Sequence, residues 1–281
     1  MLRIEFVLKA CVVFCLAAFS AVADDRRPDP GILHEHNYIP DFDGICGLGK
    51  AMSKGCEAIR AREIVDASSE PWRAIGRVNF AGFKSKQHCT GTLVSDRIVL
   101  TAAHCLYNFK RKSWIPPGSI TFVAGYQRGS SLAISRARSF VLHPAEDVTS
   151  RDFRSQPGQD WALIVLEDPI GRDVGFLNLV QLAPADVEPS EFRLAGYAGV
   201  RPYVLSVASD CGPPLGNAST ILLQKCSAMQ GDSGAPLLVV RGGETSVVGV
   251  LSSIVGWQNG LASLSVASSE FIEAWVTETQ K

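Results

Sequence analysis

The chain has almost no excess of charge of either sign, because its 27 basic and 28 acidic residues leave a net charge of −1. It therefore lacks the basic excess with which proteins bind nucleic acid, and we expect no such partner. There is no internal repeat and no low-complexity tract. The sequence also has no Cys-x-x-Cys pair and no histidine cluster of the kind that indicates zinc, so we expect neither a metal nor a cofactor.

What is present indicates a globular, β-rich protein. The 281 residues are 46% hydrophobic, which is enough for one large domain or two small ones with proper cores. Its 25 glycines and 15 prolines are scattered along the chain. Such scattering is typical of a β fold with many turns rather than of a helical bundle.

The first 23 residues differ from the rest. Arg3 and Lys9 precede an apolar run over residues 10–19, and Ala21-Val22-Ala23 then leads into the charged residues 24–27. This layout predicts a secretory signal cleaved after Ala23, since the run is too short to span a bilayer comfortably. A buried N-terminal helix is the alternative, but the abrupt change to charge argues against it. We expect a secreted or periplasmic protein with no membrane anchor once the signal is removed.

Eight cysteines are present, and Cys11 and Cys15 leave with the signal. An even number in an exported chain predicts disulfides rather than free thiols. The remaining six are Cys46, Cys56, Cys89, Cys105, Cys211 and Cys226. The simplest use of Cys46 and Cys56 is a local bridge, although a bridge to the main body stays open.

The mature chain divides into three parts. Residues 24–63 are polar, lack periodicity and are predicted to form a pro-segment or N-terminal arm. From Ile64 onward, short apolar segments alternate with turns and predict two similar β halves, about 64–170 and 171–267. Residues 268–279 predict a helix, because Ser268 and Ser269 can cap it and Phe271, Ile272, Trp275 and Val276 share one face. The predicted strands are 74–78, 92–94, 98–102, 120–124, 176–182, 192–195, 221–223, 236–240 and 246–252.

Gly231-Asp232-Ser233-Gly234 is the first candidate for chemistry. Glycines on both sides allow a tight turn that exposes the Ser233 hydroxyl, and the apolar run after Pro236 anchors this turn to a sheet. Such a turn can supply a nucleophile and backbone N–H groups for an oxyanion. Alone, the motif is equally compatible with an ordinary surface turn.

An activated serine needs a base, which is usually histidine. Of the five histidines, His34 and His36 lie in the polar arm and His143 in a loop, which leaves His88 and His104. His104 directly follows an apolar strand and precedes Cys105, which can bridge back to Cys89 and hold this turn rigid. A lone histidine after a strand is more often structural, and the neighbouring bridge is what favours the catalytic interpretation.

The base in turn needs a carboxylate that accepts a hydrogen bond from the second imidazole nitrogen. Asp160 opens the most apolar strand candidate in the middle of the chain, residues 160–166. Asp147, Asp152 and Glu146 lie in a polar loop, where we expect them to be solvated. The alternative for Asp160 is a turn residue that only begins a strand.

Taken together, Cys89-Thr90-Gly91-Thr92-Leu93-Val94, Thr101-Ala102-Ala103-His104-Cys105, Asp160-Trp161-Ala162-Leu163 and Gly231-Asp232-Ser233-Gly234 resemble the chymotrypsin-type (trypsin-like) serine proteases. The resemblance runs from about Val65 to Trp275. It implies an all-β fold of two packed six-stranded antiparallel barrels with a C-terminal helix, over residues 64–281. It also implies an endopeptidase that forms an acyl-enzyme, is monomeric and takes peptide or protein substrates.

Carried over by position, the resemblance makes His104 the general base, Asp160 its orienting partner and Ser233 the nucleophile. The N–H groups of Gly231 and Ser233 would form the oxyanion hole. A catalytically silent barrel that acts as a binding protein is the alternative. The intact triad positions and turn glycines argue against it.

Some positions depart from the animal digestive enzymes. Met229 stands where those enzymes usually carry a cysteine four residues before the serine, and the last pair, Cys211 and Cys226, is placed differently. Pro71-Trp72 and Gly234-Ala235-Pro236 are more similar to the bacterial branch related to glutamyl endopeptidases.

In the trypsin-like family, a newly cut N-terminus beginning Ile-Val pairs with the acid before the serine. Ile64-Val65 and Asp232 could act in this way, which would make the chain a zymogen. However, Glu63 rather than a basic residue precedes Ile64, and Asp66-Ala67 replaces the usual two glycines. The alternative is that Asp232 only braces the turn and that the arm stays attached.

The family's specificity pocket corresponds to Ser227, Ser252, Ser253 and Ile254, with Gly260 on the far wall. None of these residues is acidic, so a substrate lysine or arginine would be buried without a counter-charge. No histidine lies nearby, which argues against a glutamate pocket. We expect a small or medium apolar residue before the scissile bond, with Ile254 narrowing the entrance.

Overall fold

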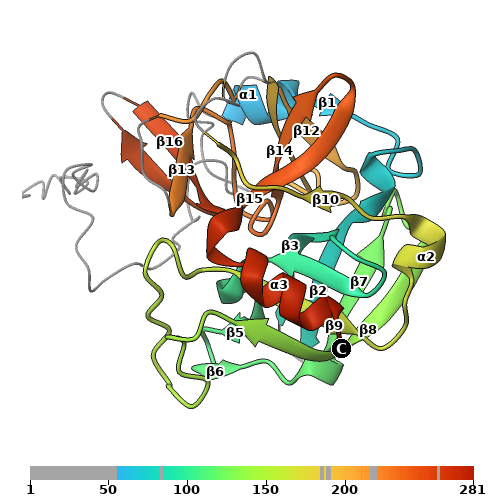
Figure 1. Ribbon diagram of the computed structural model, residues 1–281, viewed down its shortest axis with the longest axis vertical. Helices are drawn as coiled ribbons and strands as arrows, with labels where there is room; N and C mark the ends of the chain where they lie inside the picture. The colour runs from blue at the N-terminus through green and yellow to red at the C-terminus, as the bar shows by residue number, and fades with distance from the viewer. Residues whose placement is uncertain are drawn as a thin grey trace, which may run out of the picture.

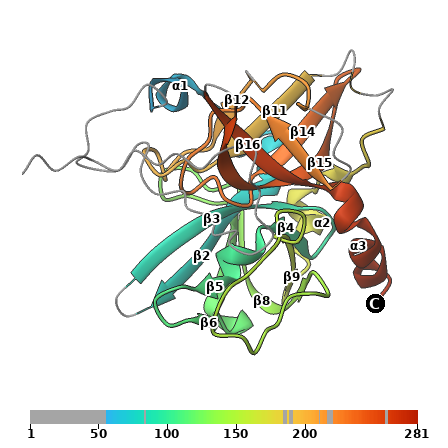
Figure 2. The same ribbon diagram turned by 90° about the vertical axis from the view of Figure 1, so that its left-hand side faces the viewer.

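A computed structural model describes residues 56–82, 85–183, 187, 191–209, 211–215, 220–257 and 260–281. The predicted signal, Cys46 and most of the predicted arm lie outside these residues, as does the side chain of Cys56. Almost all regular structure in the described part is β-strand, arranged in two halves that lie one above the other in Figures 1 and 2. The predicted all-β class is confirmed.

The first half is a closed antiparallel barrel with the strand order β2-β3-β4-β9-β8-β7. Strands β4 and β9 are buried along their whole lengths, and Val99 pairs with Ile164 at their centre. The barrel therefore closes around apolar side chains, and the predicted first six-stranded barrel is confirmed. Its strands are β2 (Ile75–Gly82), β3 (Ser85–Leu93), β4 (Ile98–Thr101), β7 (Ile120–Ala124), β8 (Ala133–Leu142) and β9 (Ala162–Leu166).

A two-stranded sheet beside the barrel joins β5 (Tyr107–Asn108) to β6 (Ser113–Trp114). The rings of Tyr107, Trp114 and Phe153 pack together there, with centroids 5.4 to 5.8 Å apart.

The second half is an eight-stranded sheet with the order β1-β12-β11-β14-β15-β16-β13, and β10 pairs in parallel with β15. Among the described residues this path has two ends, β1 and β13, so closure of a second six-stranded barrel stays a prediction. The strands are β1 (Glu63–Ile64), β10 (Asn178–Leu179), β11 (Glu191–Gly196), β12 (Ser206–Ala208), β13 (Ile221–Gln224), β14 (Pro236–Arg241), β15 (Glu244–Trp257) and β16 (Gly260–Ala267).

The helices are short and lie at the edges of the halves. The helix α1 (Cys56–Ala61) lies on the second half, and α2 (Gly171–Val174) lies between the two halves in sequence. The predicted C-terminal helix begins later than expected, because Phe271 has a φ of −130° and only a 3-10 turn precedes it. The helix proper, α3 (Ile272–Thr279), packs back on the first barrel, where Trp275 Nε1 donates to the Val94 carbonyl at 3.1 Å.

No helix in the described ranges is long and apolar enough to cross a membrane.

Candidate active site

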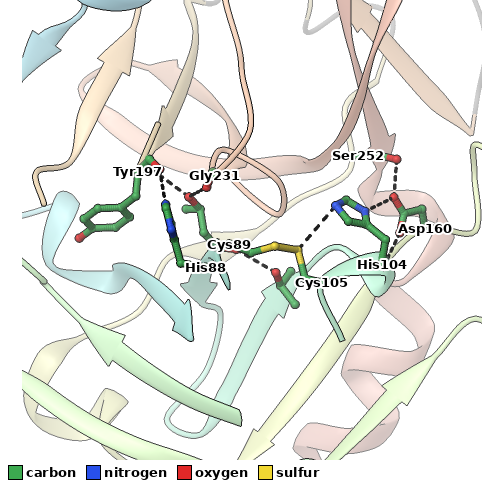
Figure 3. Close-up of a disulfide and its surroundings, with 10 residues drawn as sticks. His88, Cys89, His104, Cys105, Asp160, Tyr197, Gly231 and Ser252 are labelled. Carbon is green, nitrogen blue, oxygen red and sulfur yellow. Dashed lines mark hydrogen bonds and ion pairs between the residues drawn. A yellow bond between two sulfur atoms is a disulfide. The ribbon is translucent and has the colours of Figure 1, made fainter. Parts of the chain in front are cut away.

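His104 lies in a 3-10 turn, Ala103–Leu106, that directly follows the buried strand β4. The disulfide Cys89–Cys105 ties this turn to β3, which confirms the predicted bridge. The Cys105 sulfur lies 3.8 Å from His104 Nε2 (Figure 3). The His104 side chain is only 9% exposed, so the bridge and the barrel wall hold it in a fixed place.

The carboxylate of Asp160 accepts three hydrogen bonds at the start of the buried segment that continues into β9 (Figure 3). His104 donates twice, from Nδ1 to Oδ2 at 2.8 Å and from its backbone N–H to Oδ1 at 2.9 Å. Ser252 Oγ donates to Oδ2 at 2.5 Å. Because a carboxylate only accepts, the proton of a neutral His104 ring resides on Nδ1, and Nε2 keeps its lone pair.

Asp160 is fully buried, yet it is held in its charged form. Burial by itself raises the pKa of this carboxyl, but the charge of His104 and the hydrogen bonds from His104 and Ser252 hold the pKa below its ordinary value. A permanent negative charge at this point stabilises an imidazolium beside it.

The turn that carries Ser233 needs its glycines. Gly231 and Gly234 have positive φ angles of +96° and +77°. A Cβ on Gly231 would lie 2.4 Å from the Tyr197 carbonyl oxygen, and one on Gly234 would lie 2.2 Å from Thr101 Oγ1. Only glycine combines this backbone conformation with such close packing.

Hydrogen bonds from neighbouring strands place the Ser233 turn beside the turn of His104. Thr90 N–H donates to the Ser233 carbonyl at 2.8 Å, and Thr101 Oγ1 donates to the Thr90 carbonyl at 2.8 Å. Gly234 N–H donates to the carbonyl of Leu251 at 2.8 Å, one residue before the serine that donates to Asp160. Strands β3, β4 and β15 therefore gather Ser233, His104 and Asp160 in one region.

The backbone N–H groups of the Ser233 turn differ in whether a backbone carbonyl accepts from them. Asp232 N–H donates to the Met229 carbonyl and Gly234 N–H to that of Leu251. Within the described ranges, no backbone carbonyl accepts from the N–H of Gly231 or Ser233. The resemblance assigns the oxyanion hole to these two N–H groups, and that assignment stays a prediction.

The other described histidines do not join this group. His88 lies across the disulfide from His104 (Figure 3), and its Nε2 donates to the Tyr197 carbonyl at 2.9 Å. Burial lowers the pKa of His88. His143 packs edge-on against Trp161 at 6.1 Å. His34 and His36 lie outside the described residues.

The predicted pocket residues lie on three segments of the second half, namely the stretch after β13, β15 and β16. Ser227 follows the disulfide Cys211–Cys226, which confirms the predicted last pair. Ile254 is half-buried in β15, and Gly260 begins β16, where it pairs with Trp257. Ser252 has a different contact from the one expected, because its hydroxyl is directed at Asp160.

This hydrogen bond from Ser252 was missed at the level of sequence. The two residues are 92 positions apart, and nothing local distinguishes Ser252 from Ser253.

The disulfide also bears on metal binding. His104 and the sulfurs of Cys89 and Cys105 lie within 4.8 Å of one another. Both sulfurs are bonded to each other, so neither can act as a thiolate ligand.

Glu146 is a second acid near Asp160, and its ionisation should affect stability. Burial raises the pKa of its carboxyl to about 7, and the charge of Asp160 adds to the rise. Between pH 4.5 and about 7 the unfolded chain loses this proton while the folded chain keeps it, so stability falls as pH rises through that window. Glu146→Gln removes this loss of stability. The unfolding temperature of the variant should therefore rise relative to that of the wild type as the pH increases to about 7. Thermal melts across this range measure the difference.

The matched control is Glu273→Gln, on an exposed position of α3, which should follow the wild-type curve. A Glu146→Gln curve parallel to the wild type throughout would contradict the assignment.

Comparison with known proteins gives the family. Residues 62–202, half of the 281-residue chain, match the Trypsin family model. This region contains His104 and Asp160 and ends before Ser233.

Two curated relatives are proteases. A "Trypsin" of Simulium vittatum is 29% identical over 108 residues, which cover 38% of this chain and 39% of the relative. The human "Transmembrane protease serine 5" is 24% identical over 275 residues, covering 83% of this chain and 56% of the relative. The chain thus spans between two-fifths and just over half of the length of these relatives.

A solved structure of Glu endopeptidase in complex with MPD has the same fold. It superposes with a TM-score of 0.63 at 21% identity, over 78% of this chain and 97% of that one. An identity this low carries the fold alone. The fold and the family match together confirm the predicted resemblance, and the chain belongs to the trypsin family.

Proposed function

We propose that this chain is an exported serine endopeptidase that hydrolyses peptide bonds in peptides or proteins through an acyl-enzyme. The observation that carries the proposal is the pairing of His104 with the buried carboxylate of Asp160 at 2.8 Å, beside the glycine-flanked turn of Ser233. In this proposal His104 is the general base, Asp160 its orienting partner and Ser233 the nucleophile.

The chemistry follows from the proton positions. Ser233 Oγ attacks the scissile carbonyl carbon while His104 Nε2 takes its proton, and Asp160 stabilises the resulting imidazolium. The carbonyl oxygen becomes an oxyanion between the N–H groups of Gly231 and Ser233. His104 then gives the proton to the leaving amine as the bond between the carbonyl carbon and that amine breaks. In the second half of the reaction His104 takes a proton from water, which attacks the acyl-enzyme, and returns it to Ser233 Oγ as the acid product leaves.

The surroundings support this assignment. Ser233 is 4% exposed and Asp160 is fully buried, so the charges of the transition state would develop away from bulk water. Hydrogen bonds to a developing charge are stronger in such surroundings than in water.

A fluorophosphonate probe tests the proposal directly, because it reacts covalently with activated serines. The full chain should take up one label, and a peptide map should place it on Ser233. An unlabelled and inactive wild type would contradict the proposal and favour the catalytically silent binding protein.

For substrates, we propose a small or medium apolar residue before the scissile bond. Ser227, Ile254 and Gly260 offer no charge to a buried lysine, arginine or glutamate side chain, and burying an unpaired charge is costly. Peptide-library cleavage should favour alanine, valine or leucine by at least about tenfold over the charged residues. A profile dominated by arginine, lysine or glutamate would contradict this preference.

A further inference from the structure

We infer that Arg62 holds the Ser233 turn in its catalytically competent conformation, so that the site is assembled in the uncut chain. Arg62 is in this sense a positioning residue, and the inference rests on the proposed function. Of the two alternatives that the sequence leaves open, it favours the one in which Asp232 braces the turn and the arm stays attached over the use of Ile64 as a new N-terminus.

The carboxylate of Asp232, directly before Ser233, is completely buried and paired with Arg62. Arg62 Nη1 donates to Oδ1 at 3.1 Å and Nη2 donates to Oδ2 at 3.0 Å, and the Arg62 side chain is 1% exposed. A buried carboxylate needs a cation at this distance, because removing one partner of such a pair leaves an uncompensated charge in the interior. The guanidinium of Arg62 supplies that cation from within the chain.

The pair fixes more than the side chain of Asp232. Asp232 Oδ2 also accepts from the Met229 N–H at 3.0 Å, and Arg62 Nη2 donates to the Ser227 carbonyl. Opposite the turn, a Cβ on Gly196 would lie 2.4 Å from Asp232 Oδ1, so β11 closes tightly over the carboxylate. One guanidinium therefore holds the segment from Ser227 to Asp232, which leads into the N–H groups proposed for the oxyanion.

Arg62 is itself held from two sides. On α1, just before it, Ile59 is 1% exposed and packs against Ala198 and Met229. Arg201 donates to the carbonyls of Ile59 and Arg62, at 3.4 Å for the second. The short helix is therefore docked on the body of the protein as the base from which Arg62 reaches Asp232.

The position of Ile64 is that of an uncut chain. Ile64 is 44% exposed, and β1 pairs it with Ser206 in β12. For a new N-terminus at Ile64 to reach Asp232, β1 would have to leave its sheet and Arg62 would have to vacate the carboxylate. The guanidinium thus occupies the place that such an ammonium group would need.

Arg62→Ala tests the inference. We expect kcat/KM to fall by about 100-fold, mainly through kcat, because a loosened turn loses its oxyanion donors. The rate of fluorophosphonate labelling should fall in parallel. Millimolar guanidinium chloride should restore activity at least in part by filling the vacated site, whereas urea at the same concentration, a neutral molecule of the same shape, should not.

The matched control is Arg60→Ala, an exposed arginine two residues before Arg62, in the last turn of α1, which should stay within about twofold of the wild type. A folded Arg62→Ala variant with wild-type activity would overturn the inference, and so would equal effects of guanidinium and urea.

A second measurement does not depend on the folding of a variant. Peptide mapping of fluorophosphonate-labelled wild type should recover a peptide that runs unbroken through Arg62, Glu63 and Ile64. Label found only on molecules that begin at Ile64 would overturn the inference and leave the proposed function standing. Absence of label from every form would instead contradict the proposed function.

Discussion

Replacing Ser233 by alanine should abolish labelling by a fluorophosphonate and lower kcat for peptide hydrolysis by about 10⁶-fold. The expected loss is this large because His104 and Asp160 act only through the serine. Without the Ser233 hydroxyl, the lone pair on His104 Nε2 has no proton to take and no nucleophile to activate. Single-turnover kinetics on a chromogenic peptide measures the residual rate. The change removes one oxygen from a residue that is 4% exposed, so the fold should survive it.

Ser265 offers the matched control. It is also buried, at 1% exposure in β16, and in the described part of the chain its hydroxyl has no hydrogen-bond partner. Ser265→Ala should therefore keep both labelling and activity. Hydrolysis that persists undiminished in Ser233→Ala would assign the nucleophile to another residue.

Sequence patterns predict strands well where apolar residues face the core in an obvious run. The apolar run predicts a strand over Ile120–Ala124, and the structure has β7 with those bounds. Strand β8 was missed because its inward side chains, Ser135 and Ala137, are small, while Ile134 faces outward at 59% exposure. The apolar and polar alternation that indicates a strand is thereby reversed.

Strand β16 was missed for a related reason. Ser263 and Ser265 are each 1% exposed, so serines that resemble a loop in the sequence are buried in the sheet. The residue types do not show that these serines are buried, because their burial depends on the strands that pair with β16 on either side.

Contacts between distant segments account for what sequence reasoning missed at the site. The motifs around His104, Asp160 and Ser233 could be found because each has a local signature, a histidine beside a cysteine, an acid before an apolar run and a serine between glycines. The ion pair between Arg62 and Asp232 joins residues 170 positions apart. Arg62 has no local signature that separates it from Arg60.

For Asp160→Asn we expect kcat to fall by about 10⁴-fold, the loss that this change produces in Ser-His-Asp triads. The hydrogen bonds explain why the loss is so large. The His104 backbone N–H requires an oxygen at the position of Oδ1, so the amide NH₂ must take the position of Oδ2 and face His104 Nδ1. A neutral ring then accepts at Nδ1 and carries its proton on Nε2, where it cannot take the proton of Ser233.

The variant should remain folded, because Ser252 Oγ can reverse its role and accept a hydrogen bond from the new NH₂ group. Asp168→Asn is the matched control, since Asp168 lies just beyond the other end of β9 and accepts a hydrogen bond from Ser135 Oγ at 2.9 Å. It should change kcat by no more than about twofold. If Asp160→Asn kept the wild-type kcat, the carboxylate would not be setting the tautomer of His104, and the buried pair would be a structural contact only.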